Sequence, residues 1–248
     1  MSVVAVYSIK GGVGKTAAAV NLSYLCANEG KKTLLCDMDP QGAASYYLRI
    51  RPPKGLSAER LLGGKKISRQ IRGTDYPGLD LLPADFSYRN IDIGLDDFKK
   101  STTRLRKVFT PLLDEFDHMF IDCPPNLTLL SENIFRAADW VLVPIIPTML
   151  SINALAQLFA FLDEVKINRK KVLVFFSMAE RRKKMHLQLM ARLAKKRRVL
   201  KTPVPYMADV EKMGVFRQPV PAALPKSPAT SAYRQLWGEI KRYLEQGG

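Results

Sequence analysis

Residues 8 to 20, SIKGGVGKTAAAV, have the residue types and spacing of a phosphate-binding loop. The glycines let consecutive backbone N–H groups turn toward an anion, and a helix beginning near Lys15 adds its positive end. Lys15 can reach the β- and γ-phosphates of a nucleotide, and the Thr16 hydroxyl can reach Mg²⁺. The stretch departs from the standard motif, because Ile9 stands where its first glycine belongs and a second lysine, Lys10, precedes the glycines. The alternative is an ordinary glycine turn.

Carboxylates occur at two other places where a phosphate loop needs them. Asp122 ends the apolar segment MFID and is followed by two prolines, so we expect it at the carboxyl edge of a sheet, where it can hold a metal-bound water. Asp37 and Asp39 end another apolar segment in CDMDPQG, and the alternation of a strand points both toward one crevice. For this pair the alternative is a solvated turn. The loop and the carboxylates together predict a nucleotide site with Mg²⁺.

Short apolar segments alternate with helical patterns along the chain. We predict strands at 3 to 9, 32 to 39, 79 to 84, 118 to 125, 140 to 147 and 171 to 177, and helices at 15 to 29, 102 to 117, 127 to 138, 151 to 166, 181 to 200 and 228 to 246. Fully apolar strands are typical of a parallel sheet covered on both faces. The predicted fold class is therefore α/β, a doubly wound, mostly parallel sheet with helices on both faces. Residues 203 to 228, rich in proline, are expected to form a loop across the top of the sheet.

Length and composition suit a single domain spanning residues 1 to 248. The chain is 47% hydrophobic, which allows a full core. It has no apolar run long enough to span a membrane and no charged leader before the glycine loop, so we expect an unprocessed intracellular protein without an N-terminal helix-turn-helix extension. Its three cysteines sit singly in apolar segments and are expected to be buried.

Positive charge is concentrated in one segment. The formal net charge is +16, and residues 180 to 201 hold ten Lys or Arg against one Glu. We expect double-stranded DNA to bind there through its phosphates without sequence preference, with a solvated face, a membrane or RNA as the alternatives. The candidate DNA-binding residues are Arg181, Arg182, Lys183, Lys184, Arg192, Lys195, Lys196 and Arg198.

The closing helix has an apolar face that admits two interpretations. Tyr233, Leu236, Trp237, Ile240 and Leu244 recur at helical spacing. We expect this face to pack on the core. The alternative is a helix that lies on a membrane surface, although two glutamates dilute its basic character.

Three stretches resemble the signatures of the ParA/MinD family of deviant-Walker P-loop ATPases, most closely its Soj-like ParA branch. They are KGGVGKT, DMDPQG and IDCPP, in the order and at the separation of that family. The similarity continues through ADWVLVPIIP and PKSPATSAYRQLWGEI, so it covers essentially the whole chain. One departure is Ala17, which stands where a second threonine is common in the family.

The resemblance implies roles for individual residues. Lys10 would cross the interface of an ATP-sandwiched dimer and contact the phosphates of the partner subunit, which would explain the extra lysine. Lys10 and Lys15 would stabilise the transition state, Asp39 would orient the attacking water, and Thr16, Asp39 and Asp122 would organise the magnesium. The implied nucleotide contacts are Gly11, Gly12, Val13, Gly14, Lys15, Thr16 and Ala17 at the phosphates, and Met178, Pro205 and Met207 around the adenine.

The function that the resemblance implies is a ParA-like ATPase with ATP and Mg²⁺ as cofactors and weak hydrolysis without a partner. It would form an ATP-dependent homodimer on nucleoid DNA in the cytoplasm. A ParB-like or other cargo-linked activator would release it, and the cargo would be a plasmid, a chromosome or a protein assembly. One alternative is a MinD-like membrane-associated switch, which the location of the charge disfavours. Another is an electron-transfer ATPase like nitrogenase iron protein, which the cysteine spacing disfavours.

Overall fold

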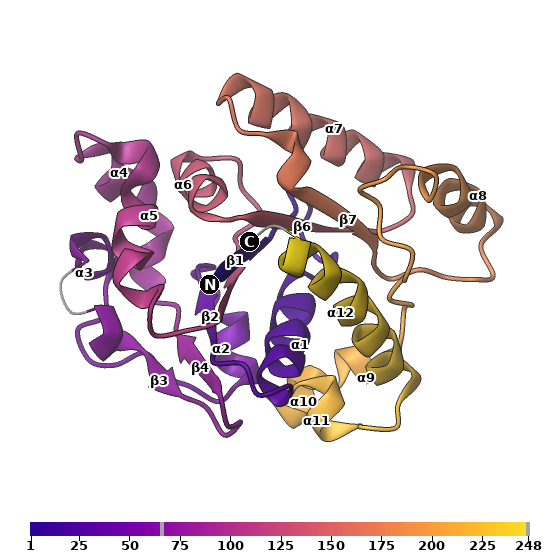
Figure 1. Cartoon of the computed structure of the whole chain (residues 1–248), viewed down its shortest axis with the longest axis horizontal. Helices are drawn as coiled ribbons and strands as arrows, with labels where there is room; N and C mark the ends of the chain where they lie inside the picture. Colours follow the sequence, from indigo (N-terminus) through magenta and orange to yellow (C-terminus); the bar gives the residue numbers. More distant parts are fainter. Residues whose placement is uncertain (65–66, 247–248) are drawn as a thin grey trace.

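A seven-stranded sheet forms the centre of the protein (Figure 1). The computed structural model describes residues 1 to 64 and 67 to 246. The strands follow the order β3-β4-β2-β5-β1-β6-β7 across the sheet. Their bounds are β1 Ser2–Val6, β2 Thr33–Asp37, β3 Arg72–Gly73, β4 Leu79–Leu82, β5 His118–Asp122, β6 Trp140–Ile145 and β7 Val172–Phe176.

Six of these strands are parallel and confirm the six predicted segments. Only β3 is antiparallel, at one edge of the sheet beside β4. It was not predicted, because two residues are too few to show any periodicity. The doubly wound, mostly parallel fold predicted from the sequence is confirmed.

The helices form two layers. Their bounds are α1 Lys15–Asn28, α2 Ala43–Tyr47, α3 Ala58–Gly63, α4 Ile91–Asp96, α5 Arg104–Phe109, α6 Leu129–Ala137, α7 Met149–Glu164, α8 Lys184–Leu193, α9 Ala208–Glu211, α10 Met213–Phe216, α11 Val220–Ala223 and α12 Pro228–Gln246. Figure 1 shows α6 and α7 on one face of the sheet and α1 and α12 on the other. Alternation along β1 serves both layers, since Val3 and Ala5 join the core under α6 while Val4 and Val6 join the core under α1.

Three predicted elements are wrong in extent or type. The helix predicted at 102 to 117 breaks into short pieces, because Pro111 lacks an N–H and clashes with the preceding turn. The helix predicted at 181 to 200 is limited to α8, because the residues after it run beside β7, where Leu200 N–H donates to the Val174 carbonyl at 2.7 Å. The loop predicted at 203 to 228 contains α9, α10 and α11. Helix α10 packs against α9 and α2, and α11 packs against α1 and α12.

The apolar face of α12 is buried, which confirms that this helix packs on the core. Its five residues at helical spacing are between 0 and 5% exposed. The alternative of a membrane-surface helix is therefore wrong for this face. Among the helices described, none combines the length and the apolar character needed to span a membrane.

Candidate functional site

The glycine loop lies between β1 and α1, at the edge where the parallel strands end. Gly12 and Gly14 have φ angles of +69° and +87°, a region that favours glycine. A Cβ on Gly14 would also lie 3.0 Å from the Ser177 hydroxyl, whereas a Cβ at Gly11 or Gly12 would meet nothing within 4 Å. The loop is thus closed against β7 at one end and open at the other, so that a phosphate can approach its backbone.

Lys15 is the cation at the base of this loop. It is 7% exposed, and its Nζ donates to the Lys10 carbonyl at 3.4 Å, a contact that closes the loop. Burial lowers the pKa of Lys15, while Asp122 and Asp39 oppose that shift. The charges of Asp122 and Asp39 therefore act on the ammonium group of Lys15.

Asp122 and Asp37 face each other across neighbouring strands. They are paired in register between β5 and β2, and both are fully buried. Asp37 accepts hydrogen bonds from the Ser45 N–H at 2.8 Å and the Ser45 hydroxyl at 2.7 Å. Its other oxygen and both oxygens of Asp122 have no hydrogen-bond partner in the described part of the chain. Buried carboxylate oxygens without partners are costly, which suits a site that receives a cation.

The same surroundings shift the acidity of both carboxyls. Burial raises the pKa of Asp122 well above its ordinary value, and Asp37 raises it further, while Thr16 and Lys15 oppose the rise. Burial raises the pKa of Asp37 to about 6, against the hydrogen bonds from Ser45. Asp37 was noted in the sequence but not assigned to the site, because the register that places it beside Asp122 is not visible along the chain.

The arrangement fits Mg²⁺ held together with phosphates. Within residues 1 to 64 and 67 to 246, no three His, Cys, Asp or Glu side chains converge as a metal site. Mg²⁺ commonly keeps several waters and takes only one or two protein ligands beside phosphate oxygens. Thr16 lies in the first turn of α1, and Asp122 ends β5. Asp39 lies just beyond β2, partly buried, and accepts from the Gln41 N–H at 2.9 Å.

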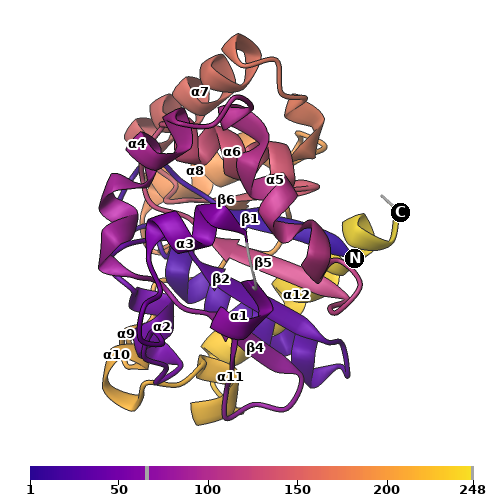
Figure 2. The same cartoon turned by 90° about the vertical axis from the view of Figure 1, so that its left-hand side faces the viewer.

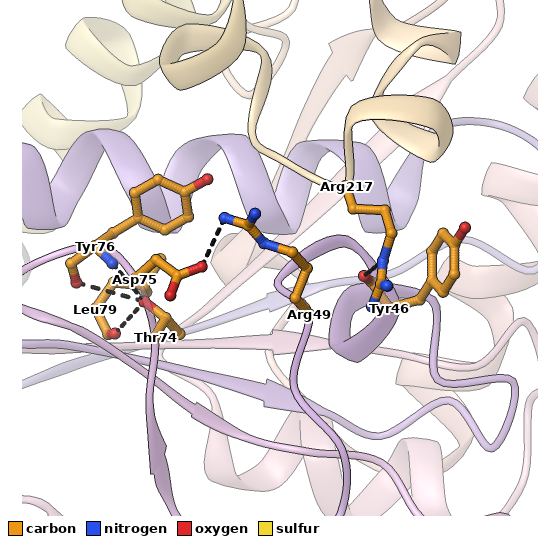
Figure 3. Close-up of polar contacts among 7 residues, drawn as sticks. All are labelled: Tyr46, Arg49, Thr74, Asp75, Tyr76, Leu79 and Arg217. Atoms are coloured by element: carbon orange, nitrogen blue, oxygen red, sulfur yellow. Dashed lines mark hydrogen bonds and ion pairs between the residues drawn. The ribbon is translucent and has the colours of Figure 1, made fainter.

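Helix α2 begins four residues after Asp39 and is held from two sides (Figure 3). Arg217, which follows α10, donates through Nε to the Tyr46 carbonyl at 3.0 Å and lies 4.5 Å over its ring. Arg49, just after α2, forms an ion pair with Asp75 at 2.6 Å. The distant segment around Arg217 therefore helps to position the helix whose Ser45 holds Asp37.

The structure also brings together residues expected around the adenine. Ala179, the residue after Met178, forms a parallel bridge with Pro205, and its N–H donates to the Val204 carbonyl at 3.1 Å. Met178 has a φ angle of +52°, and Met207 is partly buried in the core under α1. Since Ser177 touches the glycine loop, this pair of segments borders the same edge of the sheet.

Lys10 lies at the open end of the loop and is partly buried. No ion pair or hydrogen bond is found for its ammonium group among the residues that the structure describes. Cys123, next to Asp122, is 1% exposed, which confirms the prediction that it is buried.

The predicted basic helix is in fact two basic groups at the two ends of α8, which begins at Lys184 and has the exposed Arg192 in its last turn. Residues 181 to 184 follow Ala179, near the edge where β7 ends, while Lys195 to Arg198 precede the segment that pairs with β7 and lie toward the edge where β7 begins. The ten residues of α8 separate the groups by about 15 Å. The expectation of one continuous cationic helix face is therefore wrong, although most of its residues are exposed.

Comparisons with known proteins agree with this geometry. The sequence model of a family described as an AAA domain matches residues 1–175. The chain is 31% identical to the chromosome-partitioning ATPase Soj of Thermus thermophilus over 98% of this chain and 96% of that protein. It is 37% identical to the chromosome partitioning protein ParA of Myxococcus xanthus, over 66% of this chain and only 59% of that longer relative.

A solved structure gives the same result for the fold. Cobyrinic acid a,c-diamide synthase from Mycobacterium smegmatis, with a bound ATP analog and magnesium, matches with a TM-score of 0.83 and 26% identity, over 100% of this chain and 97% of that one. Its ligands agree with the ATP and Mg²⁺ expected from the sequence. The family match, the identity to Soj over nearly the full chain and the glycine loop with its carboxylates lead to one conclusion. This chain belongs to the ParA/MinD family of P-loop ATPases, in its Soj-like ParA branch.

Proposed function

We propose that this protein is an ATPase that binds ATP with Mg²⁺, forms an ATP-sandwich homodimer and binds DNA without sequence preference. A ParB-like or other cargo-linked partner then releases it by stimulating hydrolysis, which is weak without that partner. Its task is to position or partition a plasmid, a chromosome or a protein cargo on the nucleoid, in the cytoplasm. Residues 1 to 248 would act as one domain.

The observation that carries the proposal is the set of unpaired buried groups around the open glycine loop. Lys15 and the carboxylates of Asp37 and Asp122 are buried together, and three carboxylate oxygens there have no partner in the described chain. A site for a metal nucleotide explains why such groups are kept, because the phosphates and the cation would satisfy them.

Each residue then has a distinct task. Lys15 would bind the β- and γ-phosphates, and Thr16 with Asp122 would hold the metal, whose charge neutralises the phosphate oxygens. Asp39 would orient the attacking water at the metal. Lys10 would reach the phosphates bound by the partner subunit, where a cation delivered in trans stabilises the charge of the transition state.

DNA binding is supported by the surplus of exposed positive charge. Of the eight residues predicted to bind DNA, all but Arg198 are exposed, and Lys183 already pairs with Glu180 at 2.5 Å. Because the phosphates attract cations without regard to sequence, one end of α8 or both would suffice for binding.

The dimer can be tested by measuring molecular mass with light scattering after size exclusion. The wild-type protein should double its mass with ATP and Mg²⁺ and stay monomeric with ADP. Lys10→Ala should bind ATP and stay monomeric, whereas Lys31→Ala, an exposed lysine between α1 and β2, should behave as the wild type. A wild-type protein that stays monomeric with ATP, or an ATP-dependent dimer of Lys10→Ala, would contradict the proposal.

A further inference from the structure

Two grooves lie at the edge of the sheet where the strands begin, opposite the nucleotide site. The first, of about 620 Å³, is lined by Arg106 of α5, Arg136 of α6 and Lys171 before β7. The second, of about 350 Å³, lies between the end of α8 and α12. Its cations are Lys195, Lys196, Arg197, Lys201 and Arg242. Figure 2 shows the start of β1 and the end of α12 together at this edge.

Three side chains join the two grooves. Trp140, at the start of β6, lines the first groove, and Tyr243 of α12 lines the second. Their rings meet edge to face at 5.7 Å between centroids. The Arg198 guanidinium lies 5.4 Å from the Trp140 ring and 5.9 Å from the Tyr243 ring. Arg198 thus bridges the two grooves. Its contacts with the two rings explain why it is partly buried.

Positive charge dominates the joined surface, which we call the basic edge: both grooves with Arg198. Nine Lys or Arg and two carboxylates line it, a net charge of +7. Asp139 accepts from the Val3 N–H, and Glu239 accepts from the Lys201 N–H and the Thr202 hydroxyl. Both acids are thus engaged by uncharged donors.

The cations of the basic edge are left almost without counter-charges. Across the described residues, Arg136 is the only one of the nine in an ion pair, with Glu132. Lys171 also donates to the Phe135 and Ala138 carbonyls at the end of α6. Burial lowers the pKa of Lys171 and the charge of Asp139 opposes that shift, while the charges of Arg106 and Arg136 lower the pKa further, so these cations repel one another. An anionic partner would relieve that repulsion.

We propose that the basic edge, and not the group at residues 181 to 184, holds the phosphate backbone of double-stranded DNA. The inference rests on the proposed function and specifies the surface that DNA meets. The basic edge crosses the starts of three neighbouring strands, β1, β6 and β7, and continues onto helices of both layers. The basic edge is therefore longer than a single small anion. It suits the repeated phosphates of a duplex, which carries one charge per about 1.7 Å of its axis.

The proposal predicts different DNA binding for two variants that have equal changes in charge. The edge variant combines Arg106→Glu, Arg197→Glu and Arg242→Glu. The control variant combines Arg181→Glu, Arg182→Glu and Lys184→Glu. All six residues are exposed, so neither variant removes core packing.

Binding is measured by the anisotropy of a fluorescein-labelled 60-base-pair duplex, with ATP and Mg²⁺, over a series of salt concentrations. The edge variant should bind at least 10-fold more weakly than the control variant, and its log–log salt slope should shrink by about 2.7 for three lost phosphate contacts. Both variants should bind ATP as the wild type does. An edge variant that binds DNA as tightly as the control variant would overturn the inference.

The outcomes distinguish this inference from the proposed function. Loss of DNA binding in the control variant alone would place DNA at the other end of α8 and leave the proposed function standing. A wild-type protein that does not bind the duplex would contradict the proposed function itself.

Arg106→Glu alone adds a test outside the α8 segment. It lies in the first groove, and it should weaken DNA binding and reduce the salt slope by about 0.9. Unchanged DNA binding in this variant and in the edge variant would overturn the inference and leave an acidic protein as the partner of the basic edge.

Discussion

Within the described residues, the edge of the sheet where the strands end has unpaired negative groups, whereas the edge where the strands begin has unpaired positive groups. Where the strands end, Asp37 and Asp122 are buried carboxylates with oxygens that lack partners in the described chain. Where the strands begin, the basic edge holds nine cations, of which one is in an ion pair within the described residues. The first edge needs a cation and the second an anion, so the two edges are suited to different ligands.

The difference also shows how burial controls function. Buried groups cannot be satisfied by water, so their partners must be supplied by a ligand of defined geometry. Exposed cations remain solvated, so their partner gains affinity mainly from many weak, salt-dependent contacts. Single substitutions should therefore have large effects at the nucleotide edge and small ones at the basic edge.

Asp39→Ala should give the largest effect. If Asp39 orients the attacking water, its loss should lower the rate of ATP hydrolysis by about 10²- to 10⁴-fold, the range typical of such groups, while ATP affinity stays near that of the wild type. Release of labelled phosphate over long incubations, together with titration of a fluorescent ATP analog, measures both quantities. Undiminished hydrolysis would assign the water to another residue.

Lys15→Ala should weaken nucleotide binding by about 10- to 100-fold or more. The phosphate loop would lose its buried cation, and a charge-assisted contact to phosphate is worth about 1.5 to 3 kcal/mol or more in a buried site. Isothermal titration with ATP and Mg²⁺ measures the loss, with Lys31→Ala as a control for one lost exposed lysine. Near-native affinity would contradict the assignment of the loop.

Much of the nucleotide edge could be predicted from the sequence, because its signals are local. The loop from Lys10 to Thr16 and the carboxylates at strand ends each occupy a short stretch, and short stretches keep their spacing in the fold. Asp37 was not assigned to the site, since its place beside Asp122 depends on the register of two strands about 85 residues apart.

The basic edge could not be predicted, because its residues come from distant segments. A helix over 181 to 200 would have placed the charges on one face, but the pairing of Val199 with β7 ends it early. Tertiary pairing thus overrode the helical pattern, as it often does for marginal helices. Arg106 and Arg242 join the surface only through the packing of α5 and α12 around the strand starts.

Asp37→Asn should change how the stability of the protein depends on pH. The pKa of Asp37 is raised by burial to about 6, above an ordinary value of about 3.9. The folded state therefore binds the Asp37 proton more tightly than the unfolded state does. The stabilisation that this proton provides is present below pH of about 4 and is lost as pH rises through about 6. At pH 7 the charged carboxylate then costs about 3 kcal/mol at most.

Urea unfolding of the nucleotide-free protein in EDTA, between pH 4.5 and 8, measures this effect. Asp37→Asn should be more stable than the wild type at pH 7, and the difference should shrink toward pH 4.5. Asp96→Asn, which removes an exposed carboxyl of α4, is the control and should not change this way. A difference in stability that does not depend on pH would show that the charge of Asp37 does not destabilise the folded state.

Arg198→Ala should give the smallest effect, and it tests how the basic edge is built. The guanidinium lies over Trp140 and Tyr243, and exposed cation–π contacts are worth about 0.5 to 1 kcal/mol each, so the free energy of unfolding should fall by about 1 kcal/mol. DNA binding should weaken more than in Lys184→Ala, which also removes one cation but at a residue that does not join the grooves.

Arg198→Lys keeps the charge and loses the planar stacking, so it separates the two roles of Arg198. If the grooves act as one surface, Arg198→Lys should bind DNA more weakly than the wild type. DNA affinity equal to the wild type in Arg198→Lys would show that the charge of Arg198 matters and its bridging position does not.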